Sequence, residues 1–441
     1  MMVTGIKNRI GKLLSWIPLF AYISADRIGH QSWETALHCA YANKKERPLI
    51  IFYSHKTTNR LFNLLNRKGT SFVYADWIFK ILNSRLSGYV VRCFYKLIRL
   101  PLKGILKIRH KRRECIQNGS TKKTDGESCR HLPAGGECGR FSNDFAGIIF
   151  DESLRMFPFL KSMPVIDTAE RYLDFGLVTK YFKPVHIEQK RKTEDLLRKL
   201  GLSNADWFVC LHVRESSFLG DTFREWRNQD VDRYLKAVRY IVKLGGYVVR
   251  MGEASMKKMP KMENVIDYAH SKYRSDFADI CLSGKARFAI VNNSGYRCLP
   301  QLFGVPLLNV NVYPVTPMDC YQKSLIIFKK VYSTTSGKNL KLKEVLKTPM
   351  VGYYNTDEEY KNAGLKICQN SEDEILDAVK EMVQIGSDDT WEELSDEQIL
   401  FQSEIKKSLK ESPYFNDVRT HIFYPDGFCR IGSNYMRENW D

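Results

Sequence analysis

The feature that most constrains this chain is a regular alternation of short apolar runs with longer amphipathic segments, clearest after residue 205. Segments with helical spacing separate the apolar runs, which lie at residues 207–213, 247–252, 264–268, 287–293 and 306–311. Strands that alternate with helices pair in parallel, and the helices then cover both faces of the sheet. This half of the sequence therefore predicts a doubly wound α/β domain.

The first third of the chain repeats the pattern, with a strand expected near residues 17–23, a helix through 33–41 and further strands in PLIIFYSH and TSFVYAD. A chain of 441 residues exceeds what one ordinary core accommodates. We therefore expect two doubly wound, Rossmann-like domains, an N-terminal one over residues 1–180 and a second over 181–385. Residues 386–441 are helical in pattern and are expected to pack back on the N-terminal domain.

A strongly basic stretch interrupts the N-terminal domain. The chain has a net charge of +18, and residues 80–113 contain eleven Lys or Arg and no acid, with apolar residues at helical spacing. The stretch is either a solvated basic face on ordinary helices or a surface that lies on anionic lipid headgroups. Its interleaved residues are mostly aliphatic and make no stacking platform, so nucleic acid is not an expected partner. The Gly-, Ser- and charge-rich residues 116–144 are typical of a mobile segment and complete an insertion over about 80–145.

The N-terminus allows two interpretations. Lys7, Arg9 and Lys12 precede the apolar LLSWIPLFAYISA, as the basic region of a signal peptide precedes its apolar core. We favour a buried first strand, because Pro18 interrupts the run and a polar turn with a glycine follows it. No apolar run reaches the length of about 18 residues that spans a bilayer. A cytoplasmic protein is therefore expected, and the basic stretch leaves peripheral attachment to the inner membrane open.

The cysteines indicate reduced thiols. Their number is odd, eleven, and several lie inside predicted strands and helices, a pattern typical of a cytosolic protein. Cys129, His131 and Cys138 form the one cluster that resembles a metal site. It offers three ligands and no CxxC pair, so we do not expect it to bind a metal.

Polar residues and glycines follow four predicted strands of the second domain at the point where each strand ends. They are His212, Arg214, Arg250, Gly252, Asp267, Asn293, Ser294 and Gly295. Ligands bind at the carboxyl ends of the strands of an open parallel sheet. Arginine forks match phosphate oxygens, and a Ser-Gly turn before a helix offers backbone N–H groups. The set predicts a pocket for pyrophosphate and ribose, although any one of these segments alone is typical of an ordinary polar strand end.

From His212 to Asn311 the chain resembles the donor-binding half of glycosyltransferases with the GT-B fold. The matching segments are HVRE, GGYVVRMGE, NVIDYA, SDFADICLSGKARFAIVNNSG, FGVPLLNVN and QNSEDEILDAVKEM, with DRIGH and RIGSNYMREN near the two ends. The chain is most similar to an uncharacterised group of proteins assigned as glycosyltransferases from bacterial surface-polysaccharide clusters. The resemblance covers residues 150–436 well and the first 60 weakly, and the basic insertion has no counterpart.

This resemblance implies two domains that face each other across a cleft. It also implies a metal-independent enzyme of surface-polysaccharide synthesis that moves a sugar from a nucleotide-activated donor to a glycan or lipid-linked acceptor. Arg214 and Arg250 would bind the donor diphosphate, and Asp267 would lie near the base or ribose. The pocket would be lined by Asn293, Ser294 and Gly295. The HVR segment also resembles the donor-phosphate arginine motif of GT-B fucosyltransferases.

The base that activates the acceptor hydroxyl is expected in the N-terminal domain. His30 follows the first predicted strand and would face the cleft, with Arg27 and Gly29 on the acceptor side, and a histidine titrates near neutrality. A turn-capping histidine is the alternative. Asp230 and Asp232 match the DxD signature of metal-dependent transferases, but aspartate also favours the start of a helix, which is the role we predict. No metal or other cofactor is expected.

Two other functional classes remain open at this point. One is another GT-B-like enzyme, such as a nucleotide-sugar epimerase or a pyruvyl transferase acting on polysaccharide. The other is a non-enzymatic scaffold on the membrane surface, for which the basic stretch would be the functional feature. An epimerase would act on the donor alone, and a scaffold would bind lipid but no nucleotide.

Overall fold

The computed structural model describes residues 19–23, 28–53, 65–66, 70–74, 178, 181–187, 189–215, 225–313, 321, 323–348, 356–391, 393–411 and 429–440. Arg27, the basic stretch 80–113 and the insertion 116–144 lie outside the described residues.

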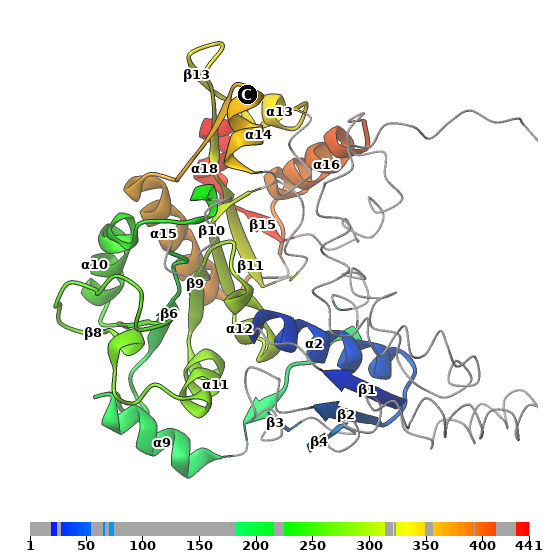
Figure 1. The fold of residues 1–441 in the computed structure, drawn as a ribbon, viewed down its shortest axis with the longest axis vertical. Helices are drawn as coiled ribbons and strands as arrows, with labels where there is room; N and C mark the ends of the chain where they lie inside the picture. The colour runs from blue at the N-terminus through cyan, green and yellow to red at the C-terminus, as the bar shows by residue number, and fades with distance from the viewer. Residues whose placement is uncertain are drawn as a thin grey trace, which may run out of the picture.

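A seven-stranded sheet dominates the molecule (Figure 1). Its strands are β6 (Phe208–Leu211), β7 (Tyr247–Arg250), β8 (Val265–Ile266), β9 (Phe288–Val291), β10 (Leu307–Val312), β11 (Ser324–Phe328) and β15 (Arg430–Ile431). Their order is β15-β11-β10-β9-β6-β7-β8, and every neighbouring pair is parallel. The parallel sheet predicted from the alternation is confirmed. The chain starts in the middle at β6, builds outward to β8, and then crosses to β9 and builds in the other direction.

Helices cover both faces of the large sheet. They are α9 (Lys190–Lys199), α10 (Leu235–Lys243), α11 (Asp276–Lys285), α12 (Cys298–Leu302) and α15 (Glu372–Asp388). Along β6, Val209 and Leu211 enter the core that α10 and α15 cover. Phe208 and Cys210 enter the separate core of α9, α11 and α12. Successive side chains of a strand point to opposite faces, which is why strands covered on both sides are apolar throughout.

A smaller parallel sheet comes from the N-terminal part of the chain, with strands β1 (Leu19–Ile23), β2 (Leu49–Tyr53) and β4 (Thr70–Tyr74) in that order. Strand β1 lies within the run predicted as the first strand. Helix α2 (Ile28–Lys44) connects β1 to β2. Its residues Cys39 and Ala42 pack with these strands, whereas Trp33 and Leu37 enter the same core as Leu299 of α12. Helix α2 is therefore buried between the two sheets.

The described part of residues 386–441 packs on the large sheet. It comprises α16 (Asp396–Glu411), β15 and α18 (Ser433–Asn439). Strand β15 pairs with β11, and Cys429, Tyr435 and Met436 are buried in the core of α10 and α15. These contacts attach the described part of the segment to the large sheet, because its apolar residues extend that core. The boundary expected at 385/386 falls inside α15.

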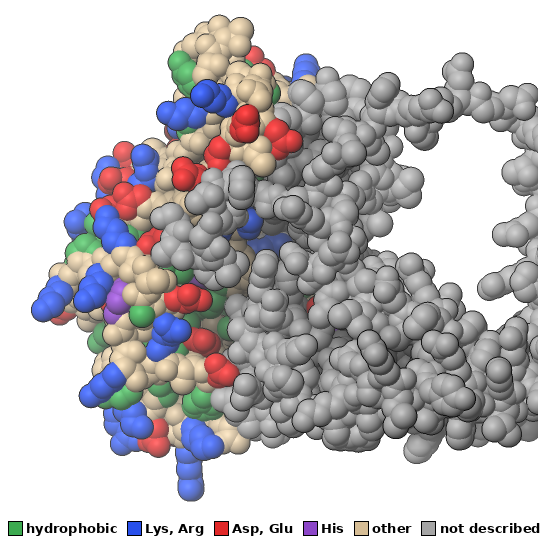
Figure 2. Space-filling model, viewed as in Figure 1, with side chains coloured by type: hydrophobic (Ala, Val, Ile, Leu, Met, Phe, Trp, Pro, Cys, Tyr) green, Lys and Arg blue, Asp and Glu red, His purple; other side chains and the backbone are tan. Residues whose placement is uncertain are grey.

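The remaining elements are short. They are β3 (Leu65–Asn66), β5 (His186–Ile187), β12 (Lys330–Ser333), β13 (Lys338–Leu340), β14 (Leu365–Cys368), α13 (Leu342–Val345), α14 (Asp357–Asn362) and the 3-10 helices η3 (Glu225–Arg227), η4 (Val231–Tyr234), η5 (Tyr268–His270) and η6 (Gly295–Arg297). Among the described helices, none has the length and apolar character that crossing a bilayer requires. Figure 2 shows acidic and basic side chains interspersed over the described part of one face.

Candidate functional site

The order in which the chain adds strands to the large sheet reverses between β6 and β9, although all the strands remain parallel. Strands β7 and β8 lie on one side of β6, and β9, β10 and β11 lie on the other. In open α/β sheets a crevice forms outside the carboxyl ends of the strands at such a reversal, and ligands bind there. The residues that follow β6 and β9 are His212 to Arg214 and Asn292 to Ser294. The four strand ends predicted to be neighbours are neighbours, in the order β9-β6-β7-β8.

His212 and Ser294 are in direct contact at this reversal. The Ser294 hydroxyl lies 3.1 Å from Nδ1 of His212, and the backbone N–H of His212 donates to the carbonyl of Ile290 at 2.9 Å. The imidazole stacks on the ring of Tyr296, with 4.7 Å between the centroids. Burial, and then the positive charges of Arg250 and Arg214, lower the pKa of His212 to about 3. The imidazole is therefore neutral at physiological pH.

Arg214 is held in place by the segment that follows η3. Its guanidinium donates from Nη1 to the side-chain oxygen of Asn228 at 2.9 Å, and its carbonyl accepts from the backbone N–H of Gln229 at 2.9 Å. Only 4% of Arg214 is exposed. A buried cation held in one orientation at the end of a strand is suited to bind an anionic group there.

Arg250 turns inward. It is fully buried, and its Nη2 lies 2.8 Å from Oε1 of Glu215 and 3.3 Å from the carbonyl of Val213. Its Nη1 donates to the carbonyl of Met251. The other oxygen of Glu215 accepts from the backbone N–H of Lys257. The guanidinium therefore joins the ends of β6 and β7, and both of its terminal nitrogens are bonded to protein groups.

Gly252 and Asp267 also have structural contacts. Gly252 has φ +139°, and a Cβ there would lie 2.4 Å from Sδ of Met256, so only glycine fits. The Asp267 carboxylate accepts from the backbone N–H of Met259 at 3.1 Å and lies 2.9 Å from Nδ1 of His270. These contacts stabilise the turns after β7 and β8.

The turn after β9 is polar and mostly buried. The side-chain amide of Asn293 donates to the backbone carbonyl of Tyr313. The backbone carbonyl of Asn293 accepts from Nη2 of Arg227 at 3.2 Å. Gly295 is exposed and begins η6. Asn292 is fully buried, and neither polar atom of its side chain has a hydrogen-bond partner among the described residues.

The predicted acceptor-side residues lie at the start of α2. Gly29 and His30 are in its first turn, where the structure describes only the backbone. At the other end of α2, Asn43 donates to the carbonyl of Tyr181 at 2.6 Å. Four residues after Tyr181, the backbone N–H of Val185 donates to the carbonyl of Leu302 at the end of α12. Helix α2 also contacts η6 and α12, and it lies beside α12 in Figure 1.

Asp230 and Asp232 form a helix start, as predicted. The Asp230 carboxylate accepts from the backbone N–H of Asp232 at 3.1 Å and caps η4. The ammonium group of Lys257 lies 3.3 Å from Asp230 and 2.5 Å from Asp232, so one lysine forms ion pairs with both carboxylates. Within the described residues, no group of three or more His, Cys, Asp or Glu side chains is arranged to hold a metal ion. The cluster of Cys129, His131 and Cys138 lies outside them.

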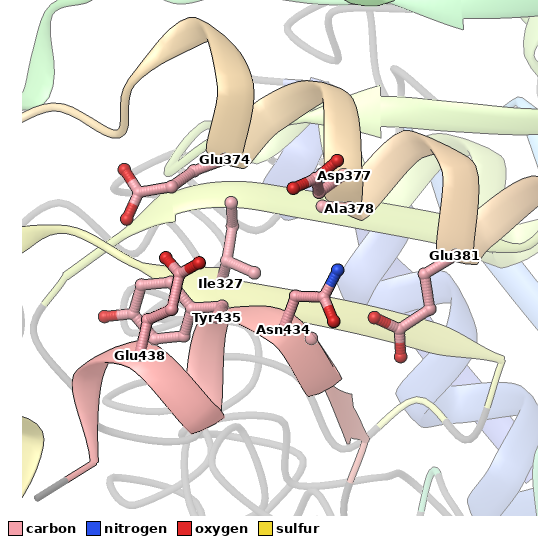
Figure 3. A pocket seen from close by; sticks show the side chains of 9 residues that line it. Ile327, Glu374, Asp377, Ala378, Glu381, Asn434, Tyr435 and Glu438 are labelled. Atoms are coloured by element: carbon pink, nitrogen blue, oxygen red, sulfur yellow. The ribbon is translucent and has the colours of Figure 1, made fainter.

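An acidic groove lies between α15 and α18 (Figure 3). Its lining includes Glu374 and Glu381 of α15 and Glu438 of α18. Two of these carboxylates already have partners. Glu374 pairs with Lys330 at 3.0 Å, and Glu381 accepts from the backbone N–H and hydroxyl of Ser433 at the start of α18. The groove is therefore explained by the packing of the two helices.

Sequence reasoning missed the segment of Arg227, Asn228 and Gln229. It spans the end of η3, within the connection between β6 and α10. A search limited to strand ends therefore does not find it. The available signal was the dense polar run RNQD directly before a predicted helix. The structure places this run against both Arg214 and the turn after β9.

No family model matches the sequence, and no curated protein matches it. Solved structures do. A glycosyl transferase family 9 protein from Veillonella parvula DSM 2008 matches with a TM-score of 0.40 and 12% identity, over 84% of this chain and 98% of that chain. The ADP-heptose lps heptosyltransferase II of E. coli matches with a TM-score of 0.38 and 11% identity, over 70% and 90% of the two chains. A protein from Listeria monocytogenes described as a UDP-N-acetylglucosamine 2-epimerase matches with a TM-score of 0.27 and 12% identity, over 91% and 98%.

Proposed function

We propose that this chain is a glycosyltransferase that moves a sugar from a nucleotide-activated donor to a glycan or lipid-linked acceptor. One observation supports it most directly. At the reversal of the large sheet, the ends of β6 and β9 bring together a neutral imidazole, a hydroxyl and a buried guanidinium, those of His212, Ser294 and Arg214. In a parallel sheet whose strand order reverses in this way, nucleotides usually bind outside the strand ends at the point of reversal.

The reaction requires positive charge at the leaving group. As the bond from the sugar to the diphosphate breaks, negative charge develops on the departing oxygen, while the acceptor oxygen bonds to the sugar carbon. Arg214 supplies a fixed cation for this charge, and His212 and Ser294 supply polar atoms beside it. In this proposal no metal ion is needed, because the guanidinium carries the compensating charge.

The acceptor hydroxyl must lose a proton as it attacks. His30, in the first turn of α2, is the proposed base, with Arg27 and Gly29 on the acceptor side of the cleft. Its support is the position of α2, which contacts both η6 and α12. A His30→Gln variant should bind the donor like the wild type but lose most of its turnover.

The proposed acceptor in surface-polysaccharide synthesis is carried by a lipid at the cytoplasmic face of the inner membrane. The basic residues 80–113 would dock the enzyme there, at about 1 kcal/mol for each cation near anionic headgroups. Liposome co-sedimentation tests this: binding should rise with anionic lipid and fall with salt. Equal sedimentation with neutral and anionic vesicles would reject membrane docking and leave the transferase reaction untouched.

The central experiment is a thermal-shift screen with UDP, GDP, CDP and ADP. At least one nucleotide should raise the melting temperature of the wild type. Arg214→Ala should lower the affinity for that nucleotide about tenfold or more. Arg239→Ala on the exposed side of α10 is the matched control. If no nucleotide shifts the wild type, the proposal fails. Turnover of a nucleotide sugar without any acceptor would instead identify an epimerase.

A further inference from the structure

Arg227, at the end of η3, and the next residue, Asn228, link two cationic side chains to the turns that follow β6 and β9. Nη2 of Arg227 donates to the carbonyl of Asn293 at 3.2 Å, in the turn after β9. The next residue, Asn228, accepts from Nη1 of Arg214 at 2.9 Å, after β6. The two arginines are therefore attached to the two strand ends that border the reversal of the sheet.

These bonds and the Ser294–His212 contact close a ring of linked residues at the carboxyl ends of β6 and β9. The ring passes through His212, Arg214, Asn228, Arg227, Asn293 and Ser294. Each bonded pair joins different segments, and the remaining steps run along the backbone between residues that are adjacent or two apart. The ring therefore links both arginines to the two turns that carry the hydroxyl and the imidazole.

The segment that carries Arg227 is itself firmly anchored. The Asp357 carboxylate accepts from the backbone N–H groups of Glu225 at 2.7 Å and Trp226 at 3.2 Å. The Trp226 ring packs edge-on against Tyr313 and Tyr360, each with 5.7 Å between centroids. A side chain held on such a segment binds a ligand without a large cost of ordering.

We propose that Arg227 is a donor-binding residue that, together with Arg214, clasps the diphosphate of the nucleotide. This rests on the proposed function, since it adds a residue to the same site. Arg227 is half-buried, whereas Arg250, the second arginine that the strand-end pattern predicts, is fully buried against Glu215. A guanidinium carries its N–H donors in a planar fork, and the bond to Asn293 orients that fork. Two such groups match the oxygens of a diphosphate.

The test measures binding of inorganic pyrophosphate and of UDP, GDP, CDP and ADP by calorimetry. Wild type, Arg227→Gln, Arg227→Lys and the exposed control Arg239→Gln are compared, each with its melting temperature. Arg227→Gln should bind pyrophosphate and the preferred nucleotide about tenfold or more weakly. Arg227→Lys should recover part of this loss, because it keeps the charge but not the fork. Arg239→Gln should bind like the wild type.

The outcomes separate this inference from the proposed function. If Arg227→Gln binds as the wild type does while Arg214→Ala is weakened, Arg227 is not part of the site and the transferase proposal stands. If the wild type binds neither pyrophosphate nor any of the nucleotides, both fail. Should Arg227→Gln not fold, Arg227→Lys decides: affinity equal to that of the wild type would count against bidentate binding by the arginine fork.

Discussion

The hydroxyl of Ser294 lies 3.1 Å from Nδ1 of His212 and so joins the carboxyl ends of β9 and β6. A serine at a turn from strand to helix, beside a histidine, has the geometry of a nucleophile and its base. The lowered pKa of His212, about 3, makes the imidazole a weak base. The pair therefore serves better as a fixed hydrogen bond at the crevice than as a hydrolytic dyad.

His212 should make the fold sensitive to acid. Its pKa is about 3 in the folded chain and near 6.5 when unfolded, so below pH 6.5 the unfolded state binds the proton first. Stability should fall as pH drops from 6.5 toward 3, with buried His38 contributing in the same direction. Urea unfolding at pH 7.5 and 5.0 should show a smaller loss for His212→Gln than for the wild type. The exposed His186→Gln variant should match the wild type, and identical losses in all three would contradict the assignment.

Arg250→Met should destabilise the protein by about 3–5 kcal/mol, because it leaves the Glu215 carboxylate buried without its cation. Removing both charges, in Arg250→Met with Glu215→Gln, should recover part of the loss. Lys236→Met breaks an exposed pair with Asp373, which solvent screens, and should change stability little. Chemical denaturation gives all the values. A cost for Arg250→Met as small as that for Lys236→Met would show that the buried pair is not structural.

Lys329 is 3% exposed between β11 and β12, and burial lowers its pKa to about 7. Between pH 7 and 10.5 the unfolded chain holds this proton and the folded chain does not, so stability should rise with pH over that window. Lys329→Met should flatten this rise and should be the more stable protein at pH 7, by a few kcal/mol at most. The exposed Lys338→Met variant should keep the slope. A pH profile of Lys329→Met parallel to that of the wild type would refute the prediction.

Asn311→Ala should cost about 2–4 kcal/mol. The variant removes two side-chain hydrogen bonds. Oδ1 of Asn311 accepts from the backbone N–H of Asn370, and the side-chain amide donates to Oε1 of Gln229 at 2.9 Å. Its φ of +57° is also easier for asparagine than for alanine. Asn339→Ala, on the exposed edge strand β13, should change stability by less than about 0.5 kcal/mol. Equal effects of the two variants, measured by urea unfolding, would rule out a stabilising network at Asn311.

Transfer should survive EDTA, and Asp232→Asn should retain most of the turnover. The reason is that both carboxylates already pair with Lys257, and Asp230 caps η4. The assay compares initial rates before and after chelation and after added Mn²⁺ or Mg²⁺. Loss of activity in EDTA that either ion restores would reinstate the two aspartates as candidate ligands.

Much of the large sheet could be predicted from the sequence, because its signals are local. Buried strands read as continuous apolar runs, and helices between them show their own spacing. The residues that end β6, β7, β8 and β9 could therefore be named before their positions were known. Asp230 could be predicted as a cap for the same reason, since a cap depends on residues two or three positions away.

The tertiary structure alone decided which partners these residues have. Arg214 and Arg250 end neighbouring strands and look equivalent in sequence, yet Arg250 turns inward to Glu215, 35 residues away in the chain. The position of Arg227 depends on Asn293, which is 66 residues away. Periodicity specifies how each segment folds, but the partner of a charged side chain depends on which strands become neighbours. That order is set by burial across the whole sheet, because each helix must cover apolar surface contributed by several strands.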